Sequence, residues 1–531
     1  FSDFTNYVQS HRIPDALFKS GRTVKELRLL EFGSSPKIKA ARFAMQVPMD
    51  QLPSSVAVES IVAEHDGPLL SIVADNDDLY HPRTGLLTHY LEHGRKWERP
   101  VFISYFEDGK ILFAGGVGLR VHGGQSRYME EKSFRLHFRD IYGDAQLPQG
   151  ILYGGKGDPI KSLIVHNDVR RMEMEDGSVF TTHFTNPLAF DIARQIGCLT
   201  PATKPVQLYL NGEYAGPYVL IEHISLEFLR AHFGKGNFTY GRSKAKPLPG
   251  RTVAKGNPDA LLDLYNEFNE IDPPLTMNYV NHKVDLANMT NWLISILITG
   301  TTDAFQGAIV KDSSSADSRW FWINWDMDHA FRDVYSLAPA GRPWEIDLFS
   351  GPHSLVDRKR IRSLIFRRLS RESPAYKTYF LRRFIDAFNH QVTTAFVRER
   401  ISYYEKIAAS FDISDTSYIS SRKNYLDKRP TILRNQVSLY FDAGPVYRMV
   451  VISPESIDLT IDGYDVNGMY VGWYVNETPA DIRISRTQKD QLFEWVINGK
   501  RIANNGSSMS ISMNSEMVIE VAPLKSSSST E

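Results

Sequence analysis

The chain has 531 residues, of which 42% are hydrophobic and 23% are charged. These are the values of a globular protein, so they exclude long disordered regions and fibrous repeats. Lys and Arg total 61 against 62 Asp and Glu, and the net charge of −1 gives no overall attraction to nucleic acid. The single cysteine, Cys198, excludes an intramolecular disulfide and a multi-cysteine zinc site. The longest apolar run, residues 292–299, is too short to span a membrane.

The first half of the chain has the pattern of β-strands. Its first seventy residues alternate apolar and polar side chains, which predicts short strands and loops. Stronger strand signals follow between residues 68 and 137, in PLLSIVAD, RPVFISYF, ILFAGGVGLRVHGG and KSFRLHF. Residues 179–197 have a helical pattern that ends at Gly197. Asn211 and Gly212 stand between two apolar runs and predict a two-residue hairpin turn, because both positions need residues that tolerate positive φ.

Beyond Pro258 the apolar residues recur every three to four positions, which predicts helices. The arginines between residues 358 and 371 are interleaved with apolar residues and are interpreted as a solvated helix face. After Ala443 short alternating strands return and predict a separate β-sandwich over residues 443–524. The serine-rich residues 525–531 are predicted to be a disordered tail. The fold class is therefore α+β, with a β-rich part before an α-rich part.

Three aspartates in the predicted helical part of the chain, beyond Pro258, are candidates for a chemical role. Asp303 comes just after an apolar helix, while Asp326 and Asp328 end the aromatic strand RWFWINWD. A hairpin between the two stretches would bring Asp303 and Asp326 together, and converging carboxylates repel unless something neutralises them. Mg²⁺ would do so, since it prefers carboxylate oxygens. A shared proton in an acid/base pair, or arginine partners in a structural network, would also do so, and the spacing leaves all three open.

Two further segments carry polar groups beside strands. In GVGLRVHGGQSRYMEEKSF the turn at Gly123 and Gly124, with Arg127 and Lys132, suits a polyphosphate, but an ordinary twisted hairpin has the same pattern. Glu222 ends an apolar strand, where a buried carboxylate needs a partner. That partner is either a helix N-terminus, a lysine or a ligand.

Several of these segments resemble, in the right order, the spore coat protein H (CotH) family of atypical secreted kinases. The matching segments are DDLYHPRTGLL, RKWERPVFISYF, GVGLRVHGGQSRYMEEKSFRLHF, VQLYLNGEYAGPYVLIEHI, TTDAFQG and WFWINWDMDHAF. The resemblance covers about residues 67–442, after an N-terminal extension of residues 1–66. It implies a bilobal protein-kinase-like fold, with a β-rich N-lobe over about 67–245, a helical C-lobe over about 246–442, and ATP with Mg²⁺ or Mn²⁺ between them.

The resemblance also implies roles for individual residues. Asp326 is the expected metal-binding aspartate, Asp328 assists it, and Asp303 takes the catalytic-loop position as base or second metal contact. Lys132 is the expected phosphate-facing lysine. The full nucleotide-binding set implied in this way is Lys132, Arg120, Arg127, Gly123, Gly124 and Glu222.

Enzymes of this family phosphorylate Ser or Thr of proteins, in the best-known cases structural proteins of spore surfaces. The expected function is therefore an ATP- and Mg²⁺-dependent protein Ser/Thr phosphotransferase that is secreted, periplasmic or on the cell surface. The chain begins at Phe1, so the lack of a signal peptide gives no argument for the cytoplasm.

One departure from the family pattern leaves a second hypothesis open. Relatives commonly have an Asn a few residues after the catalytic-loop aspartate, and here Gly307 and Ala308 stand there. A catalytically weak or inactive kinase-like scaffold or adhesin would fit this change, with the C-terminal β-domain binding a surface or matrix partner. A carboxylate-based hydrolase that uses Asp303 and Asp326 ranks last, because it gives the basic hairpin no role.

Overall fold

The computed structural model describes most of the chain after residue 66. The described residues are 25–32, 38–45 and 67–523, with gaps at 109, 143–146, 148–149, 154–159, 168–170, 174–178, 182, 243–252, 258, 273, 303–306, 333–336, 351–353, 357–359, 414–416, 485–492 and 503–505. Most of the predicted N-terminal extension, the predicted disordered tail and Asp303 thus lie outside the described residues.

The chain forms two compact units, each assembled from separate stretches. The first unit holds residues 1–190, 200–238 and 401–421, and the second holds 191–199, 239–400 and 422–531. Both α-helices and several β-sheets are present, so the predicted α+β class is confirmed.

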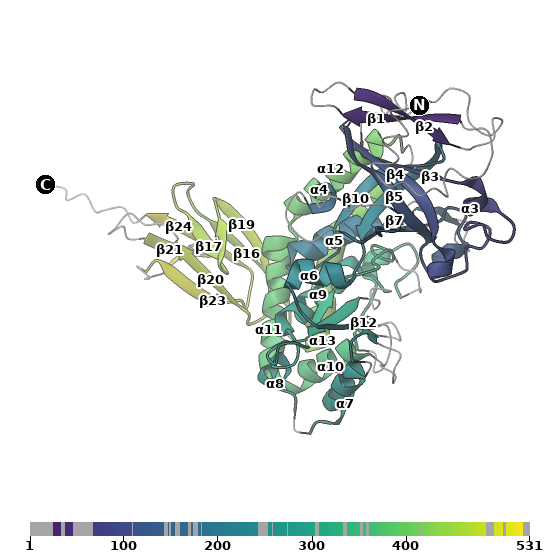
Figure 1. Ribbon diagram of the computed structural model, residues 1–531. Helices are drawn as coiled ribbons and strands as arrows, with labels where there is room; N and C mark the ends of the chain where they lie inside the picture. The colour runs from purple at the N-terminus through teal and green to yellow at the C-terminus, as the bar shows by residue number, and fades with distance from the viewer. Residues whose placement is uncertain are drawn as a thin grey trace. The chain divides into compact units, whose positions relative to one another are not determined.

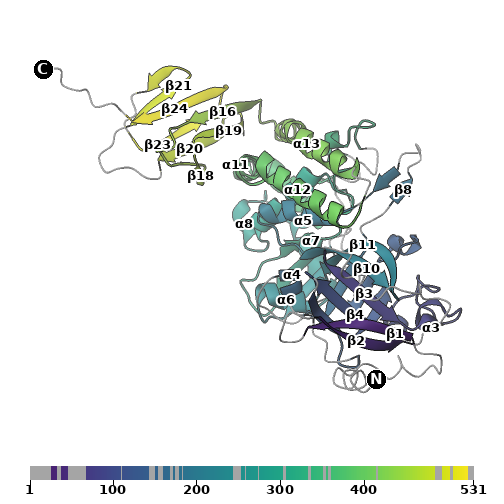
Figure 2. The same ribbon diagram turned by 90° about the horizontal axis from the view of Figure 1, so that it is seen from above.

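A closed sheet of seven strands forms the centre of the first unit (Figure 2). Its strand order is β10-β11-β7-β6-β5-β4-β3. The strands are β3 (Leu69–Ala74), β4 (Arg99–Glu107), β5 (Lys110–Val121), β6 (Phe134–His137), β7 (Ser162–His166), β10 (Thr203–Leu210) and β11 (Glu213–Glu222). Neighbouring strands are antiparallel except β3 and β10, which run parallel and close the sheet. Alternate side chains such as Val117, Leu119 and Leu136 fill its interior core.

The predicted hairpin turn at Asn211 and Gly212 is confirmed, and it connects β10 to β11. Both residues have positive φ, 52° and 84°, as a two-residue hairpin turn requires. The Asn211 side-chain oxygen accepts a hydrogen bond from the backbone N–H of Ala74 at 2.8 Å, so the turn also ties β3 into the sheet.

The other elements before residue 238 are shorter. They are β1 (Lys25–Phe32), β2 (Ile38–Met45), α3 (Asn76–Tyr80), η2 (Arg95–Trp97), η3 (Gln125–Tyr128), α4 (Gly150–Tyr153), β8 (Arg171–Glu173), β9 (Val179–Thr181), α5 (Thr185–Gln195) and α6 (Leu226–Phe233). The helix predicted over 179–197 was wrong in its first part, because residues 179–181 form β9 and pair with β8. Pro187 lies in the first turn of α5, where its missing N–H costs nothing, and this favours a helix start near Thr185.

Helices dominate the second unit, as the sequence pattern predicts (Figure 1). They are α7 (Ala260–Glu270), α8 (Met277–Asn281), α9 (Leu286–Thr299), η5 (Pro343–Glu345), α10 (Ile361–Glu372), α11 (Pro374–Asp386), the π-helical turn η6 (Ala387–Gln391), α12 (Thr394–Ser410) and α13 (Ser417–Phe441), with α12 beginning and α13 ending in this unit. Helix α9 is buried on nearly all sides, so the apolar run 292–299 belongs to a core helix. No helix among the described residues is long and apolar enough to cross a membrane.

The interpretation of the arginines at 358–371 as a solvated face was wrong for Arg362. Its side chain is fully buried, and its guanidinium lies 5.3 Å from the ring centroid of Trp292. The arginine therefore belongs to the core face of α10, where a delocalised, weakly hydrated cation can stack on an aromatic ring.

Three sheets complete the second unit. The first has the order β13-β12-β14-β15, with β12 (Phe238–Arg242), β13 (Val253–Lys255), β14 (Ala308–Asp312) and β15 (Phe321–Ile323). The C-terminal strands form one sheet of order β19-β16-β24-β21-β22 and another of order β18-β17-β20-β23. Their bounds are β16 (Val446–Ile452), β17 (Leu459–Ile461), β18 (Tyr464–Val466), β19 (Met469–Val475), β20 (Pro479–Ile484), β21 (Phe493–Ile497), β22 (Lys500–Ile502), β23 (Ser508–Ser512) and β24 (Met517–Pro523).

Candidate functional site

Helix α9 and the hairpin that follows it position the predicted acidic residues. The helix ends at Gly300, which has left-handed φ of 65° and whose missing Cβ would lie 2.2 Å from the Tyr425 hydroxyl. No larger residue fits there without a rearrangement, so the direction in which the chain leaves α9 is fixed. The catalytic-loop candidate Asp303 comes three residues later, and its role stays a prediction.

The predicted hairpin between the two acidic stretches is present. Strands β14 and β15 pair antiparallel, with Ala308 opposite Ile323. At Gly307 an added Cβ would lie 3.0 Å from the backbone oxygen of Ile323 and close to the ring of Trp292. The position where the family commonly has Asn is thus tightly packed in this chain.

Two asparagines that the sequence analysis missed hold β15 against α9. The side chain of Asn288 bonds to both backbone groups of Trp322, donating to its oxygen at 3.0 Å and accepting from its N–H at 2.6 Å. Asn324 donates to the Ser295 hydroxyl at 2.9 Å. Asn288 and Ser295 are polar residues on an otherwise apolar helix, and this pattern could have indicated such contacts, because a buried amide needs hydrogen-bond partners.

Asp326 and Asp328 lie in the segment that follows β15. Asp326 is half-buried with a left-handed φ of 56°, and Asp328 is 5% exposed. The segment then turns back, and the Phe331 N–H donates to the Thr299 oxygen at the end of α9 at 2.7 Å. Two carboxylates separated by a single residue supply the hard oxygen donors that Mg²⁺ and Mn²⁺ prefer, so the donor set fits a divalent metal ion.

The glycine turn of the first unit connects β5 to β6. Gly123 has φ of 108°, and a Cβ there would lie 2.0 Å from the Ser126 hydroxyl, whereas the space beside Gly124 is open. Gly123 is therefore required by its φ and by the space around it, while Gly124, at φ −103° and ψ −101°, has a backbone conformation that residues with a Cβ seldom adopt.

The two predicted cations beside this turn bind backbone oxygens. The buried Arg127 donates to Gly123, Val121, Tyr90 and Glu92, at 2.5–3.0 Å. The Lys132 ammonium donates to the Met129 oxygen and lies 4.2 Å from the Tyr90 ring centroid, and burial lowers its pKa. Both side chains hold the turn to the loop around Tyr90, and their phosphate contacts stay predictions.

Arg120 belongs to a different cluster, centred on Glu98. The Glu98 carboxylate is buried and lies 2.5 Å from Arg120, 2.7 Å from Arg139 and 2.9 Å from the Tyr142 hydroxyl. Burial alone would raise the pKa of Glu98, but the hydrogen bonds from Arg139 and Tyr142 and the charge of Arg120 hold it below its usual value. The carboxylate is thus ionised and orients two arginines.

This cluster contains more positive than negative charge. Arg135 of β6 is the direct cross-strand partner of Arg120, and like charges in that position repel. Its guanidinium donates to the Ser162 hydroxyl at 3.2 Å and contacts His223 at 3.1 Å. Two guanidiniums, of Arg120 and Arg139, thus contact the single carboxylate of Glu98, and Arg135 adds a third positive charge beside Arg120, a charge excess that suits an anion such as a phosphate. The sequence analysis missed Arg135, because the twelve residues between β5 and β6 leave the register of the two strands open.

His137 is the neutral member of the same cluster. Its side chain is buried 3.8 Å from Glu98. Burial lowers its pKa to about 3, the arginines add to the shift, and Glu98 opposes it. The imidazole is therefore uncharged at neutral pH and adds no further repulsion to the arginines.

Glu222 lies at the end of β11 and is 4% exposed. It accepts a hydrogen bond from the Ala202 N–H at 3.4 Å, and His232 of α6 lies 4.0 Å away. Burial raises the pKa of Glu222, and these two contacts oppose that rise. The partner found for this acid is a histidine rather than the lysine considered from the sequence, and a nucleotide contact stays a prediction.

The sequence was compared with families of known proteins. The model described as CotH kinase protein matches residues 119–438, which is more than half of the chain. The chain belongs to the CotH kinase family. The family resemblance inferred from the motifs is thereby confirmed, and it implies a kinase-like transferase. The matched range contains all of the predicted site residues, from Arg120 to Asp328.

This CotH kinase family member was also compared with solved structures and with curated sequences. Among solved structures it is similar to the proinflammatory kinase CtkA of Helicobacter pylori, with 10% sequence identity and a TM-score of 0.30. That match covers 58% of this chain and 94% of CtkA. No curated protein sequence matches the chain.

Proposed function

We propose that this chain is an ATP- and Mg²⁺-dependent protein Ser/Thr phosphotransferase of the CotH type that acts outside the cytoplasm, with a bilobal kinase fold and a C-terminal β-sandwich. The family match over residues 119–438 is the observation that carries this proposal. Secretion or surface exposure, and a protein substrate, rest on what the family resemblance implies.

The metal ion is assigned to the segment after β15. Asp326 and Asp328 would hold Mg²⁺ or Mn²⁺, which supplies charge neutralisation for the phosphates when bound. Asp303 would accept the proton of the substrate hydroxyl or contact the metal ion as well. Gly300 and the Asn288 contacts support this role, because Gly300 fixes where the chain leaves α9, ahead of Asp303, and Asn288 holds Trp322 of β15, the strand that leads into Asp326.

The phosphates of ATP are assigned first to Arg120. Its guanidinium is oriented by Glu98, and Arg135 and Arg139 add positive charge beside it. Lys132, which the family resemblance makes the phosphate-facing lysine, and Arg127 stay predicted contacts, acting through the turn at Gly123 and Gly124 that they hold in place.

The test replaces Asp326 by Asn. Asn tolerates the left-handed backbone found at this position and keeps the size of the side chain, so the change removes only the charge. Autophosphorylation with labelled ATP and Mg²⁺ is expected to fall by about 100-fold or more, the scale of losing one charge-stabilising group. The exposed Asp317 on the β14–β15 connection gives the control, and Asp317→Asn is expected to transfer phosphate like the natural chain. Equal transfer by Asp326→Asn and the control would refute the metal assignment.

A second candidate function is a kinase-like scaffold or adhesin without transfer activity. The packing at Gly307 favours it, because a Cβ there would lie only 3.0 Å from the Ile323 oxygen, so a metal-binding side chain is crowded where relatives commonly have Asn. A thermal-shift measurement with ATP and Mg²⁺ or Mn²⁺ separates the two functions. A ligand that binds the folded state raises its stability, so an unchanged melting temperature at millimolar nucleotide would favour the scaffold.

A further inference from the structure

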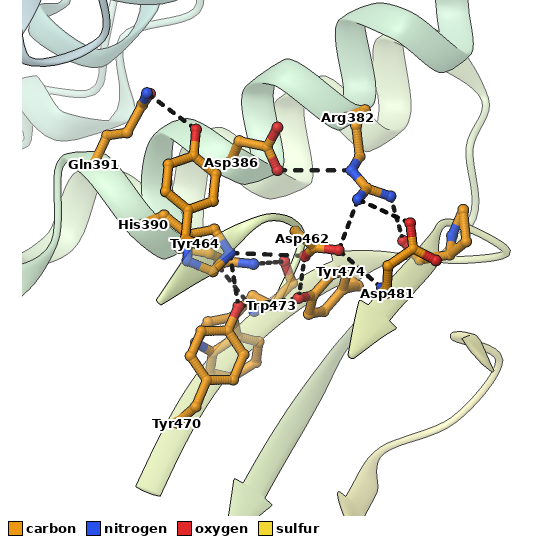
Figure 3. Close-up of polar contacts among 12 residues, drawn as sticks. Arg382, Asp386, His390, Gln391, Asp462, Tyr464, Tyr470, Trp473, Tyr474 and Asp481 are labelled. Atoms are coloured by element: carbon orange, nitrogen blue, oxygen red, sulfur yellow. Dashed lines mark hydrogen bonds and ion pairs between the residues drawn. The ribbon is translucent and has the colours of Figure 1, made fainter. Parts of the chain in front are cut away.

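A cluster of three ligand-type side chains lies where the C-terminal β-domain meets helix α11, within the second unit (Figure 3). Asp386 ends α11, His390 lies four residues later in the π-helical turn η6, and Asp462 lies between β17 and β18. Each of the three offers one ligand atom, and these atoms all lie within 4.8 Å of one another. Turns of π-helix are rare and are frequent at functional sites.

Asp386 contributes an oxygen that is not satisfied by hydrogen bonds. The residue is 8% exposed, and its Oδ1 atom is buried and makes no hydrogen bond within the described part of the chain. The Nε atom of Arg382 lies 3.7 Å from this oxygen, beyond hydrogen-bond distance. A buried carboxylate oxygen without a donor is costly, so a bound cation would stabilise the arrangement.

His390 directs its Nε2 atom at the Asp462 carboxylate. Its ring is stacked between Tyr464 and Tyr470, with centroid distances of 4.3 and 5.4 Å and interplanar angles of 7° and 13°. Its Nε2 atom lies 3.7 Å from Asp462 Oδ2 and 3.4 Å from the Tyr470 hydroxyl. The two tyrosines thus fix the plane of the imidazole with Nε2 directed at the carboxylate, as Figure 3 shows.

Asp462 is held by contacts of the kind that surround a metal-binding carboxylate. Its Oδ1 atom accepts from Arg382 at 2.7 Å and from the Asp481 N–H at 2.9 Å, and its Oδ2 atom accepts from the Tyr474 hydroxyl at 2.6 Å. Carboxylates that bind metals are usually oriented by such outer hydrogen bonds. Arg382 contacts the Oδ1 side, and Oδ2 faces His390.

We propose that Asp386, His390 and Asp462 bind a divalent transition metal ion of the zinc class. One imidazole nitrogen with two carboxylate oxygens is a mixed set that suits Zn²⁺ or Mn²⁺, whereas Mg²⁺ and Ca²⁺ prefer oxygen ligands alone. The ion would connect the end of α11 and η6 to the turn between β17 and β18, and so hold the C-terminal β-domain to the helices. The site is separate from Asp326 and Asp328 and does not depend on the proposed kinase activity.

The first experiment titrates Zn²⁺ into the metal-free full chain by calorimetry. One zinc ion per chain is expected, and its affinity is expected to fall by about 100-fold or more in Asp386→Asn and in His390→Gln, since outer-shell changes alone already cost 10–100-fold. Asp481→Asn is the matched control, because this carboxylate lies 3.5 Å from Arg382 but is not among the three ligands. The control is expected to bind zinc like the natural chain, and excess Mg²⁺ is not expected to displace the ion.

A second measurement does not depend on how well the variants fold. Crystals of the natural chain grown with Zn²⁺ are expected to show anomalous scattering between Asp386, His390 and Asp462. Zinc found only elsewhere, no stoichiometric binding, or equal affinity in His390→Gln and Asp481→Asn would overturn the proposal. Any of these results would mean that Arg382 is the cation that neutralises the two carboxylates.

Discussion

The buried imidazole of His137 predicts that the closed sheet loses stability in mild acid. Its pKa falls from the usual 6.5 to about 3 in the folded chain, because burial and the neighbouring arginines oppose protonation. The unfolded chain takes up a proton at His137 near pH 6.5, and the folded chain does not. The contribution of this residue to the free energy of unfolding is therefore complete above pH 6.5 and is lost as the pH falls toward 3. Each pH unit in this window costs about 1.4 kcal/mol, which gives about 2 kcal/mol between pH 7 and pH 5.

Hydrogen exchange of the amides in β5 and β6 measures this loss locally, after correction for the intrinsic pH dependence of exchange. We expect the opening free energy of these strands to be about 2 kcal/mol lower at pH 5 than at pH 7 in the natural chain. His137→Gln removes the titrating group, so its difference between the two pH values should be smaller by about that amount. The exposed His93 gives the control, and His93→Gln should behave like the natural chain. An unchanged pH dependence in His137→Gln would refute the argument.

Two further substitutions test how the candidate site is positioned. Gly123→Ala should lower the free energy of unfolding by about 1–3 kcal/mol, because its Cβ would meet the Ser126 hydroxyl and φ is 108°. A lower melting temperature of the variant measures this loss. Gly124→Ala meets no steric contact and has only the backbone strain of φ −103° and ψ −101°, so its cost should be smaller than that of Gly123→Ala, and a larger cost would contradict the assigned turn. Asn288→Ala leaves two buried backbone groups of Trp322 unpaired, so it should lower the free energy of unfolding by about 2–4 kcal/mol. Urea titrations measure this loss. A loss below about 0.5 kcal/mol would show that β15 does not need this contact.

Local features of the fold could be predicted from the sequence, because they depend on residues that are neighbours in the chain. The turn at Asn211 and Gly212 needs two residues that accept positive φ, and few other pairs do so. The hairpin of β14 and β15 likewise follows from two apolar runs separated by a polar serine-rich turn. Beyond Pro258 the helices have strong periodicity, so their presence was also clear.

Features that need distant partners could not be predicted in the same way. The parallel pairing of β3 with β10 leaves no local pattern, since parallel strands are joined by long connections. The cluster around Glu98 draws residues from three separate stretches, and nothing near Glu98 indicates that it is buried. Arg362 has the spacing of a surface residue next to core positions, but the ring of Trp292 on another helix accepts it. In each case a residue that is distant in the sequence decides the strand pairing or the burial of the side chain.

The parallel pairing of β3 with β10 has a consequence for how the chain is made. The seven strands cannot close until β10 has left the ribosome, long after β3 has done so. Until that moment β3 has a free edge, which is a template for pairing with other chains. A fragment ending before residue 203 should therefore aggregate rather than fold, and a soluble form of the first unit must contain β10 and β11 as well as residues 401–421.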